Sequence, residues 1–137
     1  RIGFICGKRH QTYTNLMSTN ECIVCVPHRS QAGEVMNAGR ASGRDLNKFK
    51  ELNVKTFTGS RIDALVPEEV VAYLECRVER CVDLDSSAFF IAEPLLSAAQ
   101  KNIFKERLLV EKAAAATLHH LGGNSFAFPG PEILRPE

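Results

Sequence analysis

The stretch Glu69–Ala92, EVVAYLECRVERCVDLDSSAFFIA, decides the fold that this sequence predicts. Residues 69–84 alternate along most of their length between an apolar side and a charged side, and Glu75 falls on the charged side. Such alternation is typical of an antiparallel strand with one buried face. Residues 85–87 predict a turn, after which residues 88–92 return as the partner strand. The stretch therefore predicts a β-hairpin.

The sequence before the hairpin predicts short strands and short helices. Three apolar, β-branched runs predict strands at residues 2–6, 21–26 and 54–57. Three runs with helical spacing predict helices at residues 12–17, 30–37 and 45–52. Thr12 or Thr14 is the expected N-cap of the first helix, and Ser30 that of the second. Asn20 is expected to end the first helix in the left-handed conformation.

The sequence after the hairpin predicts one helix, one short strand and a tail. Residues 102–118 favour a helix because they include four consecutive alanines and place apolar side chains on one side. The glycine pair at 122–123 is expected to end this helix, and residues 125–128 predict a last strand. Residues 129–137 are rich in proline and predict a loose tail, which leaves residues 1–128 as a single domain.

Strands with short helices between them indicate a mainly β protein. This pattern fits a small β-barrel that carries helices better than a doubly wound sheet. The length of 137 residues and the hydrophobic content of 45% indicate one compact, soluble domain. A formal net charge of +1 argues against a general nucleic-acid binder and against a membrane-surface protein.

The location of the protein is predicted from its apolar runs and its cysteines. No run is long enough to span a membrane, and no signal-peptide pattern opens the sequence. Five cysteines at irregular spacing favour a reducing compartment, so we expect a cytoplasmic protein. The sequence starts at Arg1 without a methionine, which suggests a missing segment upstream.

Cys22 and Cys25 have the CxxC spacing of zinc and redox sites. They lie on a predicted strand, where residues three apart point to opposite faces, so the two thiols are not expected to meet. Cys76 and Cys81 lie on the predicted long strand and face the same difficulty. We therefore expect no metal site, and a zinc or thiol-redox function is a distant alternative.

The stretch Ala38–Phe49, AGRASGRDLNKF, is a candidate anion site. Its turn at Ser42 and Gly43 is flanked by arginines and is expected to run into a short helix that Asp45 opens and that carries Lys48. Free backbone N–H groups, the positive end of a helix dipole, a hydroxyl and cations together favour a phosphate. The alternative is an ordinary capped turn with solvated charges.

A second basic turn, Lys8-Arg9-His10, leads into Thr12 and Tyr13. Positive charge, a hydroxyl and an aromatic ring at a strand-to-helix junction suit a phosphate or a flat ring. The alternative is a solvated turn with the tyrosine ring packed on the core.

Six motifs in order resemble the flavin reductase-like family of FMN-binding split β-barrels, which includes flavoredoxin and a ferric reductase. They are GKRHQTYTNL, ECIVCVP, GRASGRDLNKFKELNV, YLECRVER, FFIAEP and HHLGGNSFA, and they extend from Gly7 to Ala127. The resemblance implies a homodimer of split barrels with FMN bound near the dimer interface. It also implies an FMN-dependent oxidoreductase that passes electrons from NAD(P)H through the flavin to a flavin or another small-molecule acceptor.

The resemblance assigns ligand contacts to residues of both basic turns and of one later motif. The residues that it places along the flavin and its phosphate are Lys8, Arg9, His10, Thr12 and Tyr13. Ser42, Gly43 and Arg44 would close over the cofactor, and Lys48 would balance the charge of the phosphate. His119 or His120 would approach the edge of the flavin or a nicotinamide. No catalytic residue is implied.

The sequence departs from the family pattern at its start. Family members usually begin with some tens of residues that supply two or more barrel strands before the position of Arg1 here. Without them we expect an open sheet edge and part of the cofactor site to be lost. The alternative function is therefore a non-catalytic, shortened relative that keeps the dimeric barrel but binds flavin weakly or not at all.

Overall fold

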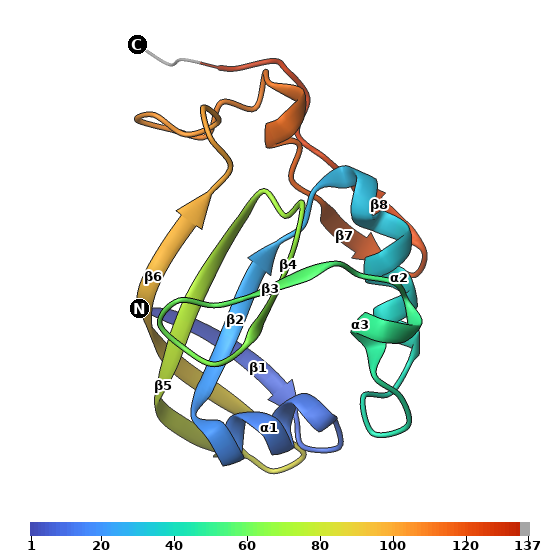
Figure 1. The fold of residues 1–137 in the computed structure, drawn as a ribbon, viewed down its shortest axis with the longest axis vertical. Helices are drawn as coiled ribbons and strands as arrows, with labels where there is room; N and C mark the ends of the chain where they lie inside the picture. Colours follow the sequence, from blue (N-terminus) through green and yellow to red (C-terminus); the bar gives the residue numbers. More distant parts are fainter. Residues whose placement is uncertain (135–137) are drawn as a thin grey trace.

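The computed structural model describes residues 1–134, and a curled antiparallel sheet of four strands dominates it (Figure 1). The strands follow the order β1-β6-β5-β2. Their bounds are Ile2–Gly7 for β1, Glu21–Val26 for β2, Ala72–Leu84 for β5 and Ser87–Ala99 for β6. The expected mainly β, split-barrel class is confirmed, as is the hairpin, which β5 and β6 form.

Strand β6 is longer than the sequence predicts. It continues through Pro94 to Ala99, whereas the pattern ends the strand at Ala92. Pro94 lies opposite Cys76, at a point where the register of the two strands shifts. Because proline has no N–H to donate, a sheet accepts it at such an irregularity and the strand continues beyond it.

The four remaining strands of the described residues form two small sheets of two strands each. β3 (Thr56–Thr58) pairs with β4 (Leu65–Pro67), and β7 (His119–Gly122) pairs with β8 (Ser125–Ala127). The predicted strand at 125–128 is confirmed as β8, and the weaker one at 54–57 overlaps β3. Strand β4 has only three residues and no alternation that could have predicted it.

The prediction of a helix over residues 102–118 is wrong. Only the short 3-10 turn η2 (Ala113–Ala115) is helical there. Ile103 and Ala115 are instead buried against Val71 in a cluster of their own, so tertiary packing overrides the helix propensity of the alanines. The glycine pair at 122–123 forms the turn between β7 and β8, with φ angles of 107° and 55°, and does not end a helix.

The three helices before the hairpin overlap the predicted ones, although α3 is shorter than predicted and most of the caps differ. Their bounds are Gln11–Thr19 for α1, Ala32–Arg40 for α2 and Lys48–Glu51 for α3, with the 3-10 turn η1 (Arg29–Gln31) before α2. Asn20 ends α1 in the left-handed conformation, as expected. The N-cap of α1 is His10 and not a threonine, because the backbone is already helical at Gln11. Ser30 lies inside η1, whose cap is His28.

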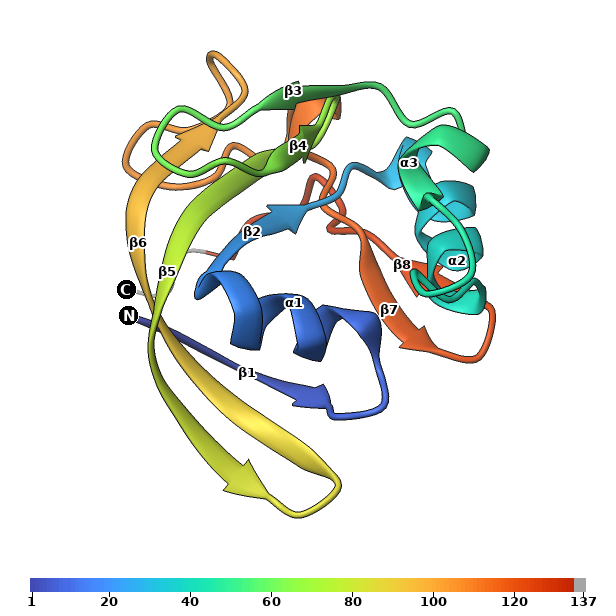
Figure 2. The same ribbon diagram turned by 60° about the horizontal axis from the view of Figure 1, so that its bottom comes forward.

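The main core lies between the sheet and α1, which crosses the concave side of the sheet (Figure 2). Phe90 is fully buried there, together with Leu16 and Ala88. The ring of Phe90 stacks on Phe4 at 5.6 Å and meets the edge of Tyr13 at 6.0 Å. Burial of these rings supplies much of the free energy that holds α1 on the sheet.

Glu75 is fully buried, although the alternation of β5 predicts an exposed side chain. The turn between β3 and β4 covers this face of β5 and encloses the carboxylate. The carboxylate accepts hydrogen bonds from Ser60 N at 3.0 Å, Ser60 Oγ at 3.2 Å, Arg61 N at 2.6 Å and Ile62 N at 3.1 Å. Burial alone would raise the pKa of Glu75, but these hydrogen bonds outweigh it and lower the pKa below its ordinary value.

The buried carboxylate predicts a specific loss of stability in acid. Because the pKa of Glu75 is lower in the folded protein than its ordinary value of 4.5, its contribution is complete above pH 4.5. That contribution disappears as the pH falls through the folded-state pKa. We therefore expect the free energy of unfolding, measured with urea from pH 7 to pH 3, to be higher for wild type than for Glu75→Gln, and this difference to become smaller in acid. A difference that stays constant over this range would contradict the lowered pKa of Glu75.

Among the described residues, no helix has both the length and the apolar character needed to cross a membrane. Residues 129–134, the described part of the predicted tail, form neither helix nor strand, and residues 135–137 lie outside the described residues.

Candidate functional site

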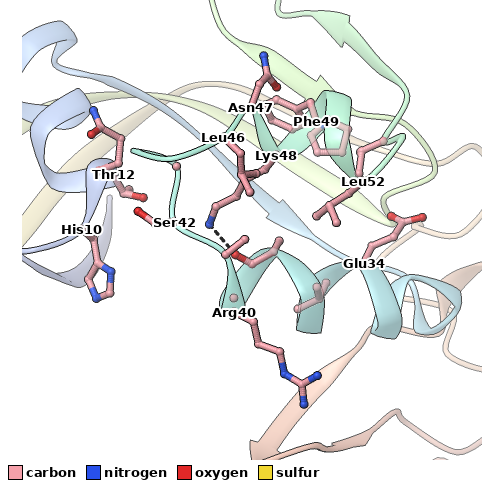
Figure 3. Close-up of a pocket in the computed structure, with 18 of the residues that line it drawn as sticks. His10, Thr12, Glu34, Arg40, Ser42, Leu46, Asn47, Lys48, Phe49 and Leu52 are labelled. Carbon is pink, nitrogen blue, oxygen red and sulfur yellow. Dashed lines mark hydrogen bonds between the residues drawn. The ribbon is translucent and has the colours of Figure 1, made fainter.

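A large open cavity lies beside the sheet, between α1, α2, α3 and β4 (Figure 3). Its volume is about 1120 Å³. This is slightly above the roughly 300–1,000 Å³ that small-molecule sites enclose, so a cofactor-sized ligand has room there. Figure 3 shows Thr12 and Leu52 on opposite sides of the cavity, with Lys48 between them.

The α1 side of the cavity is cationic. Arg9, His10 and Thr12 line it from the start of α1, and Ser42, Gly43 and Arg44 line it from the loop after α2. A Cβ on Gly43 would lie 3.5 Å from Gln11 Cβ, so the loop packs directly on the start of α1. The structure therefore brings the two predicted basic turns together at one site.

Two of the arginines at this end are available to a ligand. Arg9 and Arg44 form no ion pair among the described residues, although the neighbouring Lys8 does. Ser42 Oγ accepts a hydrogen bond from Arg44 N at 3.2 Å and so shapes the loop. Free guanidinium groups beside a cavity favour an anionic ligand, and a phosphate above all.

The helix that contributes its dipole is not the predicted one. Asp45 was expected to open a helix, but α3 begins only at Lys48, after the cap Asn47, whose Oδ1 accepts from Lys50 N at 3.2 Å. The positive end of α1 faces the cavity instead, since Gln11 and Thr12 of its first turn line it. His10 makes no side-chain cap and the first turn of α1 contains no acidic residue, so neither offsets this end of the dipole.

Lys48 spans the middle of the cavity. Its Nζ donates a hydrogen bond of 2.5 Å to the carbonyl of Ala38, in the last turn of α2 (Figure 3). A cation at this end of a helix complements the negative end of the dipole. The same bond ties α3 to α2 across the base of the loop that carries Ser42 and Arg44.

The opposite end of the cavity is mainly apolar. The residues that line it include Pro27, Val35, Leu52, Val54, Pro67 and Val70. Cys25 lines the cavity too, and burial raises the pKa of its thiol to about 11, so the thiol is neutral near pH 7. A cavity with one cationic and one apolar end suits a ligand that joins a phosphate to a flat ring.

Three of the predicted site residues lie outside the cavity lining. Lys8 forms an ion pair with Asp83 at 2.6 Å, and this hydrogen bond raises the pKa of Lys8. Tyr13 packs on Phe90 in the core. His119, on β7, forms a hydrogen bond of 2.9 Å between its Nε2 and Thr117 Oγ1. Their roles toward a flavin stay predictions.

Sequence reasoning missed the face of α2 that lines the cavity. Gln31, Glu34, Val35 and Ala38 follow the spacing of one helix face and all line the cavity. Arg40, the last residue of α2, donates a hydrogen bond of 2.9 Å to Asn124 Oδ1, at the tip of the β7–β8 hairpin. The helical spacing was readable, but the sequence did not indicate which face meets a ligand.

The cysteines follow the strand geometry. Cys22 packs on the core and lies opposite Cys76 in the β2–β5 ladder, whereas Cys25 faces the cavity. Burial and the neighbouring Cys76 raise the pKa of Cys22 to about 11. Among the described residues, no group of three or more His, Cys, Asp or Glu side chains is arranged to hold a metal ion.

Comparison with known families and relatives bears on this cavity. The model of the flavin reductase like domain matches residues 1–117. An uncharacterized protein of Archaeoglobus fulgidus is 27% identical over 105 residues, which cover 77% of this chain and 59% of that relative. The chain thus spans less than two thirds of the length of this relative.

Solved structures show the same fold. An FMN-binding protein from Thermus thermophilus, solved with bound 1-cyclohex-2-enone, has a TM-score of 0.84 and 17% identity, over 98% of this chain and 72% of that one. Flavoredoxin of Desulfovibrio vulgaris has a TM-score of 0.83 and 16% identity, over 98% of this chain and 73% of that one. The architecture is therefore the one that FMN-binding split barrels use.

Proposed function

Because the chain belongs to the flavin reductase-like domain family, we propose that it binds FMN in the cavity between α1 and α2. The observation that carries the proposal is the division of this cavity into an apolar end and a cationic end, whose Arg9 and Arg44 form no ion pair within residues 1–134. These residues fit the group, since FMN joins a phosphate to a flat, weakly polar ring system. Bound FMN would supply hydride and single-electron transfer.

The residues of the cationic end would hold the phosphate. Arg9 and Arg44 offer charge-assisted hydrogen bonds, and Ser42 and Thr12 offer hydroxyl donors. Lys48 lies between the two ends and would share its charge with the phosphate while its bond to Ala38 keeps the loop closed. The apolar end would cover the ring and exclude water from it.

The proposed reaction is electron transfer from NAD(P)H, through the flavin, to a second flavin or another small-molecule acceptor. We propose that the protein acts as a cytoplasmic homodimer. The free state of all five cysteines supports a reducing compartment, and exposed apolar residues such as Ile5 and Val82 support a partner surface on the sheet.

One observation favours the second candidate, a non-catalytic relative with weak flavin affinity. β1 and β2 each pair on one side only in the described part of the chain, so the sheet is open at both edges.

Titration of the purified chain with FMN separates the two candidates. We expect flavin fluorescence to change on binding, and the free energy of unfolding to rise by about 2.7 kcal/mol when FMN is present at 100 times its Kd. NADH and NADPH are then tested for bleaching of the visible absorption of the bound flavin under anaerobic conditions. No change in fluorescence or melting temperature at saturating FMN would overturn the proposed function. Binding without bleaching by either donor would support the non-catalytic candidate.

A further inference from the structure

We propose that Glu75 is a positioning residue for the cofactor cavity: its buried carboxylate holds the β3–β4 hairpin, whose two ends form part of the apolar wall. The inference rests on the proposed function only where its test measures flavin affinity. Glu75 does not line the cavity and would touch no ligand.

The hydrogen bonds that the structure describes for the Glu75 carboxylate all come from one segment. All four hydrogen bonds to its carboxylate come from Ser60, Arg61 and Ile62. The carboxylate forms no ion pair among the described residues, so three backbone N–H groups and the Ser60 hydroxyl stabilise its charge. Gly59 makes the approach possible, because a Cβ there would lie 2.8 Å from Glu75 Oε2 and 2.9 Å from the carbonyl of Ile62.

The β3–β4 hairpin has few other attachments to the main sheet. In the part of the chain that the structure describes, its strands pair only with each other. The turn is closed by a hydrogen bond of 2.8 Å from Gly59 N to Ala64 O. Beyond the carboxylate, the body of the hairpin rests on apolar contacts such as the edge of Phe57 against Tyr73, at 5.6 Å, and Glu68 O, just after β4, accepts a hydrogen bond from Gln31 Nε2 at 3.2 Å. Apolar contacts are not directional, so the hydrogen bonds of Glu75 fix the position of the turn, while Gln31 holds the end of the hairpin.

The ends of the hairpin reach the cavity. Val54, just before β3, and Pro67, at the end of β4, both line it. A hydrogen bond of 2.9 Å from Glu68 N to Lys55 O joins these two ends, so they move together. A shift of the turn near Glu75 is therefore transmitted to the apolar wall, and the opening of that wall would expose the half-buried Cys25 further.

The test compares Glu75→Gln with Glu106→Gln, an exposed control that also removes one negative charge. The glutamine keeps the shape of the side chain but turns an N–H₂ group toward backbone donors. Three readouts are taken at a temperature where both variants are fully folded: alkylation of Cys25 by iodoacetamide, followed by mass spectrometry, trypsin cleavage after Arg61, and the Kd of FMN and of riboflavin.

We expect Glu75→Gln to raise the rates of Cys25 alkylation and of Arg61 cleavage, and to weaken FMN and riboflavin equally, each by about tenfold. The two flavins respond alike because the displaced wall does not touch a phosphate. Ser60→Ala, which removes one of the four donors, is expected to give a smaller change in the same direction and serves if Glu75→Gln does not fold.

Unchanged Cys25 alkylation and Arg61 cleavage in folded Glu75→Gln would overturn the inference. So would a loss of stability without any change in the affinity for either flavin, since that is the result of a purely stabilising role. If the wild type binds no flavin, the proposed function fails alone, and the alkylation and cleavage rates still decide the role of Glu75.

Discussion

An Arg9→Ala/Arg44→Ala variant is expected to bind FMN on the order of 10²–10³-fold more weakly than wild type, with the affinity for riboflavin changed by less than about threefold. Both guanidinium groups line the cationic end of the cavity without an ion pair among the described residues. Each is thus available for a charge-assisted hydrogen bond to the phosphate, which riboflavin lacks. Fluorescence titration with both flavins, at low and at high salt, measures the effect.

The matched control is Lys50→Ala/Arg80→Ala. It removes the same number of positive charges from exposed side chains outside the cavity. We expect this control to bind FMN nearly as well as wild type, and its small loss to disappear at high salt. Equal losses of FMN and riboflavin affinity in the Arg9→Ala/Arg44→Ala variant would contradict the proposal that the cationic end holds the phosphate.

Replacing Phe90 with alanine is expected to cost about 3–5 kcal/mol of unfolding free energy. Phe90 is fully buried and contacts the rings of Phe4 and Tyr13, so its removal leaves a void between α1 and the sheet. The free energy of unfolding of a domain of this kind is about 5–15 kcal/mol in total, so the substitution removes a large fraction of it. Urea unfolding at neutral pH measures the change.

Phe104→Ala is the control for this substitution, because Phe104 is 60% exposed. It is expected to change the unfolding free energy by no more than about 0.5 kcal/mol. Similar losses in the two variants would show that the cluster around Phe90 is not the main core.

The β-hairpin was predictable because its signal is local. Period-two alternation and a polar turn lie within one continuous stretch, and β5 and β6 pair as that stretch indicates. The exposure of Glu75 was mispredicted because it depends on the β3–β4 turn, which the alternation of β5 does not describe. The alanine-rich segment failed as a helix for a similar reason, since its packing against Val71 outweighs its local propensity.

The sequence predicted many of the residues that line the cavity, but not the shape of the cavity. Both basic turns were singled out by composition, and most of their predicted contacts line one cavity. Their meeting depends on the contact of Gly43 with Gln11, two residues far apart in the sequence. Lys8 and Tyr13 carry the same chemical signal as their neighbours, but an ion pair and a core contact direct them elsewhere.

The hydrogen bond from Lys48 to Ala38 has a consequence for the evolution of this cavity. It closes the loop at its base through a side chain, so residues 41–46 can change without releasing α3 from α2. Substitutions at residues 41–46 would therefore change the lining of the cavity while the frame behind it stays fixed.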